Sequence, residues 1–122
     1  MVLVDSNIII YGIHPDYQSV RDYLAQQEIA VSDITFIEVL GFHALTEKDE
    51  KKLKQLFSVC HRYGLDAKVI EQAINLRQQK KISLGDTIIA ATALEHELLL
   101  VTANEEDFDW IADLKIHNPV TS

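Results

Sequence analysis

Three of the 19 acidic residues lie inside otherwise apolar sequence, and these are the residues whose types and spacing favour chemistry. Asp5 follows a valine–leucine–valine run, Glu38 lies between isoleucine and valine, and Asp86 opens a long apolar segment. Clustered carboxylates repel one another and take up protons unless a cation neutralises them. Oxygen ligands with water completing the shell suit Mg²⁺ or Mn²⁺ rather than zinc. If the fold brings these acids together, we expect Mg²⁺ or Mn²⁺ as the cofactor.

Most of these acids also have a purely structural interpretation as helix caps. The candidates are Asp5 alone and two pairs with capping-box spacing, Ser83 with Asp86 and Asn104 with Asp107. Glu38 fits this interpretation worst. It lies four residues after Ile34 and three before Gly41, so we expect it on the inward face of a helix, where a lone carboxylate is costly.

The elements that must position these acids alternate along the chain. Short apolar runs predict strands at 2–4, 29–31 and 98–102, with weaker ones at 58–61 and 115–117. Helices are predicted after Asp5, at about 17–27, at 34–45, after Thr46, at 66–80 and after Ser83, with a short helix or turn at 104–110. Continuous apolar strands alternating with helices indicate an α/β fold with a parallel sheet covered on both faces.

This arrangement brings the acids to one edge of the sheet. Asp5 ends the first strand, Glu38 lies early in the helix after the second, and Asp86 lies in the first turn of the helix that leads into the strand at 98–102. Asn104 and Asp107 follow the carboxyl end of that strand. Open α/β sheets bind ligands in the crevice outside the carboxyl ends of their strands.

A divalent ion held by carboxylates is well suited to hydrolysing phosphodiesters, because it lowers the pKa of bound water and offsets charge on the phosphate. No phosphate-binding glycine motif, zinc-ligand spacing or paired nucleophile and base occurs in the sequence. The net charge of −8 argues against broad electrostatic capture of nucleic acid. A binding face can nevertheless be basic on an acidic body, and Arg77, Lys80 and Lys81 are the best candidates for nucleic-acid backbone contacts. The lysines at 48, 51, 52 and 54 fit an ordinary solvated helix face better.

Length and composition set the remaining expectations. The 122 residues fit one domain, 1–122, and the single cysteine, Cys60, excludes an internal disulfide. No apolar stretch approaches 18 residues, so we expect no membrane span. The N-terminus has no basic segment and meets an acid early, which is untypical of a secretory signal. We therefore expect a cytoplasmic location.

Four segments together resemble the PIN-domain nucleases, most closely the small bacterial and archaeal toxins of the VapC type. They are Leu3-Val4-Asp5-Ser6-Asn7, Ser32 with Thr35-x-x-Glu38, Gly85-Asp86 through Ala93, and Leu100-Val101-Thr102-x-Asn104-x-x-Asp107-Phe108. The resemblance covers essentially the whole chain. It implies a three-layer α/β/α sandwich with a five-stranded parallel sheet. It also implies a Mg²⁺- or Mn²⁺-dependent endoribonuclease, the toxin of a toxin–antitoxin pair, that is usually dimeric and is inhibited by a cognate antitoxin.

The resemblance also implies which side chains hold the metal and act in catalysis. Asp5, Glu38 and Asp86 match three family acids, and the fourth acid lies at the position of either Asn104 or Asp107. Asp107 is the better candidate here, with Asn104 contacting the metal site through its amide oxygen. Two other classes stay open. One is a catalytically silent PIN-like binding module; the other is a phosphoryl-transfer or receiver domain, which the absence of an acid pair beside Asp5 and of a lysine after the last strand disfavours.

Overall fold

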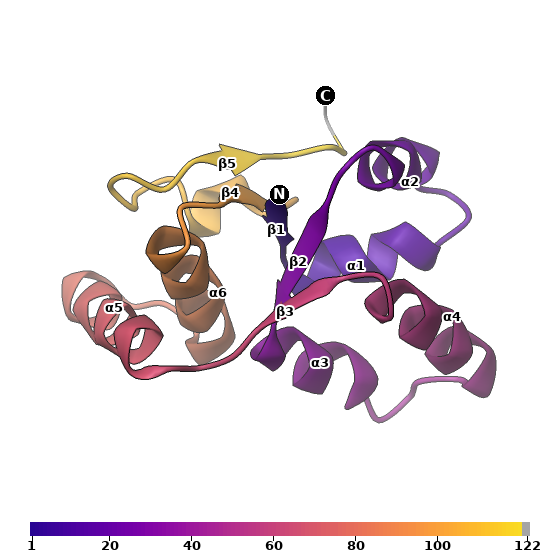
Figure 1. Ribbon diagram of the computed structural model, residues 1–122, viewed down its shortest axis with the longest axis horizontal. Coiled ribbons are helices and arrows are strands. Elements are labelled where there is room, and N and C mark those ends of the chain that lie inside the picture. Colours follow the sequence, from indigo (N-terminus) through magenta and orange to yellow (C-terminus); the bar gives the residue numbers. More distant parts are fainter. Residues whose placement is uncertain (121–122) are drawn as a thin grey trace.

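The computed structural model describes residues 1–120 and is built around a five-stranded, wholly parallel sheet (Figure 1). The strand order is β3-β2-β1-β4-β5. The strands are β1 (Val2–Val4), β2 (Ile29–Ser32), β3 (His61–Tyr63), β4 (Leu99–Val101) and β5 (Ile116–His117). The predicted α/β fold with five parallel strands is thus confirmed. Strand β1 lies at the centre, where Val2 pairs with both Ile29 and Leu99.

Six α-helices and one 3₁₀ helix connect the strands within the described part of the chain. They are α1 (Ser6–Ile13), α2 (Gln18–Ala25), α3 (Asp33–Leu40), α4 (Glu47–Phe57), α5 (Ala67–Gln79), α6 (Leu84–Glu95) and η1 (Glu105–Asp107). Five of the α-helices begin at a side chain that accepts a backbone N–H of the first turn: Asp5, Ser32, Thr46, Asp66 and Ser83. None of these helices is long and apolar enough to cross a membrane.

Helices cover both faces of the sheet. In Figure 1, α1, α2 and α4 lie on one side of the strands and α5 and α6 on the other. Alternation along β1 serves both layers, because Val2 and Val4 pack into one hydrophobic cluster and Leu3 into the other. Residues Thr87 to Ala93 of α6 are all buried, so the long apolar segment that Asp86 opens forms a buried helix.

Two predicted elements differ from the structure. The strand predicted at 58–61 lies instead at His61–Tyr63, because residues 58–60 continue hydrogen-bonded turns at the end of α4. The helix predicted at 34–45 ends at Leu40, so Gly41 and Leu45 lie beyond it. Ile37 lies three residues after Ile34, a spacing typical of one helix face, yet it is 69% exposed.

Candidate active site at the carboxyl edge of the sheet

Asp5 is a buried carboxylate fixed at the end of the central strand. Its backbone N–H donates to the carbonyl of Val101, and its Oδ1 accepts the N–H of Ile8 at 3.0 Å. The residue is 4% exposed. Burial raises the pKa of the Asp5 carboxyl from 3.8 to about 6, and the charges of Asp86 and Glu38 add to this rise. Asp5 therefore caps α1 and also carries a charge that the fold disfavours.

Glu38 lies on α3, and its carboxylate is held between α1 and α6. Ser6 of α1 donates its hydroxyl proton to Oε1 of Glu38 at 2.7 Å. The other oxygen, Oε2, lies against Gly85 at the start of α6. The expected inward face is wrong, because Glu38 is exposed and Gly41 is exposed beyond the end of the helix. The carboxylate is positioned by polar contact at the sheet edge rather than by burial.

Asp86 occupies the first turn of α6. Its backbone N–H donates to Oγ of Ser83 at 3.2 Å, so the predicted cap is formed. Partial burial raises the pKa of the Asp86 carboxyl, and the nearby charges of Asp107 and Glu38 raise it further, while a hydrogen bond with the Ser83 side chain lowers it. Asp86 therefore takes part in the helix cap through its backbone and also has its carboxylate near the other acids.

Asp107 and Asn104 lie on the exposed segment after β4. The negative charge of Asp107 contributes to the raised pKa of the Asp86 carboxyl. The side chain of Asn104 makes no capping hydrogen bond, so the predicted capping box between these two residues is not formed. The backbone N–H of Asn104 instead donates to Oγ1 of Thr102 at 3.0 Å. The Thr102 side chain also hydrogen-bonds Asp5, and so links this segment to the buried carboxylate.

The structure thus brings the predicted carboxylates together pair by pair: the charges of Asp86 and Glu38 act on Asp5, and those of Asp107 and Glu38 act on Asp86. Asn104 lies on the same segment as Asp107. Sequence reasoning missed the polar residues that hold them. Ser6, Thr35 and Thr102 have hydroxyls at this edge, and the Ser6 hydroxyl also lies 3.4 Å from Oγ1 of Thr35. Thr35 and Thr102 are fully buried. Their burial and contacts are visible only in the fold, so no signal in the sequence marks these hydroxyls.

Of the basic candidates, Arg77 lies in the last turn of α5, and Lys80 and Lys81 lie between α5 and α6. Arg77, Lys80 and Lys81 are all exposed, and Nζ of Lys80 lies 5.4 Å from the centre of the Trp110 ring. Within residues 1–120, no ion pair joins them to the acids. On α4, Lys54 instead pairs with Glu50 one turn away, as expected for a solvated helix face.

The described side chains fit a divalent cation in ligand type and in charge. Asp5 and Asp86 both have raised pKa values to which neighbouring negative charges contribute, and no Lys, Arg or His side chain among residues 1–120 pairs with either. In that same part of the chain, no three His, Cys, Asp or Glu side chains lie in positions to hold one metal ion together. The argument that these carboxylates suit a divalent cation therefore depends on their oxygen donors and their uncompensated negative charge.

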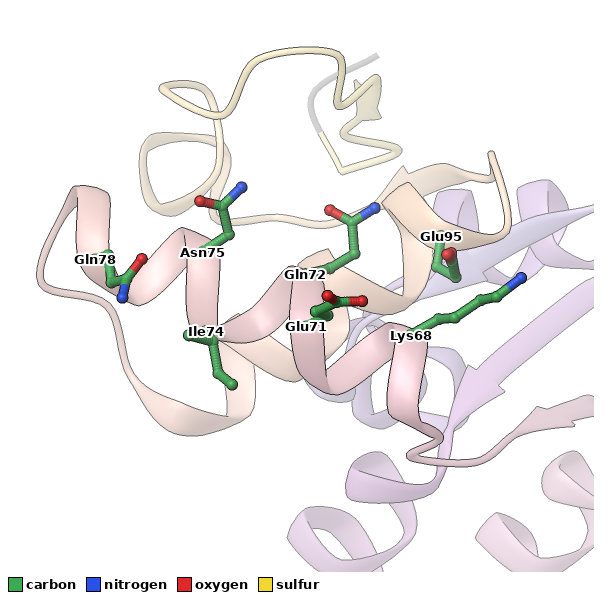
Figure 2. A pocket seen from close by; sticks show the side chains of 7 residues that line it. All are labelled: Lys68, Glu71, Gln72, Ile74, Asn75, Gln78 and Glu95. Atoms are coloured by element: carbon green, nitrogen blue, oxygen red, sulfur yellow. The ribbon is translucent and has the colours of Figure 1, made fainter.

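A separate pocket lies on the outer side of α5 (Figure 2). Six of its seven lining residues come from α5, from Lys68 to Gln78, and the seventh is Glu95 of α6. Amide, carboxylate, ammonium and isoleucine side chains share this surface. None of the predicted site residues lines it.

Comparisons with known proteins agree with the fold. Residues 2–114 match the model of the PIN domain family. The chain is 30% identical to Ribonuclease VapC2 of Rickettsia felis, over 95% of this chain and 96% of that protein. A toxin–antitoxin complex from Klebsiella pneumoniae contains a chain that is 30% identical, with a TM-score of 0.80 and 98% of each chain covered. The Rickettsia felis VapBC2 structure, bound to a DNA fragment from its promoter, matches at 25% identity and a TM-score of 0.84, covering 97% of this chain and 98% of that one. The chain belongs to the PIN-domain family and, within it, to the VapC-type proteins.

Proposed function

We propose that this protein is a Mg²⁺- or Mn²⁺-dependent endoribonuclease and the toxin of a toxin–antitoxin pair. The observation that carries the proposal is the convergence of Asp5, Glu38, Asp86 and Asp107 at one sheet edge, with Asp5 buried and none of the four paired with a basic side chain in the described residues. The similarity to a protein named a ribonuclease supports RNA as the substrate.

Asp5, Glu38, Asp86 and Asp107 are the oxygen donors that would hold the ion, after drawing closer together than they lie in this structure. A bound divalent ion would lower the pKa of a water molecule and offset charge on the scissile phosphate. Hydrogen bonds from the Ile8 N–H and the Thr102 side chain fix the Asp5 carboxylate at the strand end. Water attacks the phosphate in line, which leaves a 5′-phosphate and a 3′-hydroxyl. Among residues 1–120, no histidine forms a hydrogen bond or ion pair with the four acids, so no histidine pair is placed to make a cyclic phosphate.

Arg77, Lys80 and Lys81 are proposed to bind the RNA backbone. All three are exposed, and they precede the helix that carries Asp86. Local positive charge near the acids lets a protein of net charge −8 hold a polyanion at one place. Selectivity among RNAs then comes from surface shape and unpaired bases.

The proposed partners are an antitoxin and a second copy of the chain. The similar solved chain from Klebsiella pneumoniae is described as part of a toxin–antitoxin complex. An antitoxin that places a basic group among the acids would compete with the ion by charge-assisted pairing. Ile70 and Ile74 lie one turn apart on the exposed face of α5, and this apolar face supports a homodimer contact. We further propose that residues 1–122 act as one domain in the cytoplasm.

The test is cleavage of a panel of structured RNAs, including tRNAs, with Mg²⁺, with Mn²⁺ and with EDTA. We expect cleavage only with the divalent ions, 5′-phosphate products, and complete loss in Asp5→Asn. Asp16→Asn is the matched control, because Asp16 is an exposed acid in the loop between α1 and α2. Cyclic 2′,3′-phosphate products, or full activity in EDTA, would overturn the mechanism.

The second candidate is a catalytically silent PIN-like binding module. It is favoured by one observation, that Asp5 accepts a backbone N–H and so serves as a helix cap irrespective of any metal. Such a module would bind RNA equally well in EDTA and would cut none of the panel. Expression in a bacterial host separates the two, since only the toxin should arrest growth and be relieved by a neighbouring small protein.

A further inference from the structure

The carboxylate of Glu38 occupies a space that exists only because residue 85 is glycine. A Cβ atom built on Gly85 would lie 2.5 Å from Oε2 of Glu38 and 3.1 Å from its Cδ. Carbon and oxygen atoms that are not bonded do not approach to 2.5 Å, so a methyl group at residue 85 and this carboxylate cannot both stay where they are. The contact is the closest that a side chain would make at any of the four glycines apart from the helix-end carbonyl beside Gly41.

The opposite side of the same carboxylate is held by Ser6. Its hydroxyl donates to Oε1 of Glu38 at 2.7 Å and lies 3.4 Å from the buried hydroxyl of Thr35. Helix α3, which carries Glu38, packs against both α1 and α6, so the two contacts reach the carboxylate from separate elements. A glutamate that is exposed and otherwise unpacked would sample several rotamers, and these two contacts restrict it.

We propose that Gly85 and Ser6 are positioning residues for Glu38: Gly85 leaves the space for its carboxylate at the start of α6, and Ser6 orients one of its oxygens. Both residues act through Glu38. The inference rests on the proposed function, in which Glu38 is one of the carboxylates that hold a divalent ion. Residues that orient the ligands of a metal typically change its affinity by about 10- to 100-fold when they are altered.

The chemistry of the contact makes the substitution Gly85→Ala informative. The colliding atoms belong to the free end of a flexible side chain, so Glu38 can turn away without a shift of the backbone. Alanine also favours a helix over glycine. Folding should therefore be unharmed while the carboxylate is displaced, which separates a positioning role from a structural one.

The experiment measures the melting temperature against Mn²⁺ concentration for the full chain, starting from EDTA, with RNA cleavage as a second readout. For Gly85→Ala we expect an unchanged or higher melting temperature in EDTA. The variant should need at least about tenfold more Mn²⁺ than wild type for the same rise in melting temperature. Ser6→Ala should shift the Mn²⁺ dependence in the same direction. Gly64→Ala is the matched control, because its Cβ would meet an oxygen of Asp33 at an ordinary 3.5 Å.

A double-mutant cycle shows whether the effect passes through Glu38. In a Glu38→Ala background, Gly85→Ala should cause no further loss of Mn²⁺ response, because the side chain that it displaces is gone. If the wild type responds to Mn²⁺ and both Gly85→Ala and Ser6→Ala respond identically to it, the positioning inference alone is overturned. Additive losses in the Glu38→Ala background overturn it too. If the wild type shows neither a Mn²⁺ response nor cleavage, the proposed function fails, and this inference fails with it.

Discussion

Replacing Asp5 by asparagine should stabilise the metal-free protein, although Asp5 is the most buried of the site acids. Its carboxylate is 4% exposed, and burial together with the charges of Asp86 and Glu38 raises its pKa to about 6. The fold therefore opposes the charged form at neutral pH. Asparagine keeps the shape, its Oδ1 still accepts the N–H of Ile8, and its amide group can donate to the hydroxyl of Thr102.

The size of the effect follows from the two pKa values. The Asp5 carboxyl titrates near 3.8 when unfolded and at about 6 in the fold, and each pKa unit corresponds to about 1.4 kcal/mol. The charged carboxylate thus costs the metal-free fold at most about 3 kcal/mol above pH 6. Because the folded state binds more protons between these two values, wild-type stability should fall as pH rises from 3.8 to about 6 and then level off. Asp5→Asn removes this contribution to the dependence of stability on pH.

Urea unfolding in EDTA at pH 4 and at pH 8, followed by circular dichroism, measures the difference. We expect Asp5→Asn to exceed wild type by about 1 to 3 kcal/mol at pH 8 and by much less at pH 4. Asp16→Asn, at an exposed acid, should track wild type at both pH values. If Asp5→Asn is less stable than wild type by the same amount at both, the carboxylate is chiefly a hydrogen-bonded cap and the reasoning from buried charge is refuted.

Three further outcomes test the site, the partner surface and the RNA contacts. Asp86→Asn should abolish cleavage and most of the rise in melting temperature that Mn²⁺ causes. The melting temperature in EDTA should not fall, because Ser83 still caps α6. A destabilised variant that cuts RNA would contradict the metal role. Ile74→Arg, at a side chain 54% exposed on α5, should convert a dimer to a monomer in light scattering, whereas an unchanged mass would refute this interface. Replacing Lys80 and Lys81 by glutamine should weaken RNA binding and flatten its dependence on log salt by about one to two units, and an unchanged slope would exclude them as phosphate contacts.

The parts of the fold that could be predicted from sequence are those whose signals are local. A helix cap such as Ser83 needs only a short polar side chain and the N–H three residues later, and this cap forms as predicted. The central strands are short apolar runs, and the pattern 98–102 correctly contains Leu99–Val101. In each case the information lies within a few neighbouring residues.

The errors occur where distant partners decide the outcome. Strand β3 is His-Arg-Tyr, a polar edge segment that joins the sheet through backbone pairing of Ala30 with His61, and this leaves no apolar pattern to detect. On α3, the apolar residue Ile37 faces solvent while Thr35 is fully buried. Hydrophobicity alone would bury Ile37 and expose Thr35. The packing of α3 against α1 and α6 sets the orientation of the helix instead.

The same contrast explains why the acids were found and their supports were not. A carboxylate within apolar sequence is an exceptional residue, whereas a serine, a threonine or a glycine suits many environments, so Ser6 and Gly85 acquire meaning only when Glu38 lies between them. The burial that disfavours the charge of Asp5 also weakens screening by water, so a cation that neutralises it gains more than it would at the surface. The burial of Asp5 therefore both destabilises the metal-free protein and strengthens ion binding. Substitutions that stabilise the metal-free protein at this site should weaken ion binding.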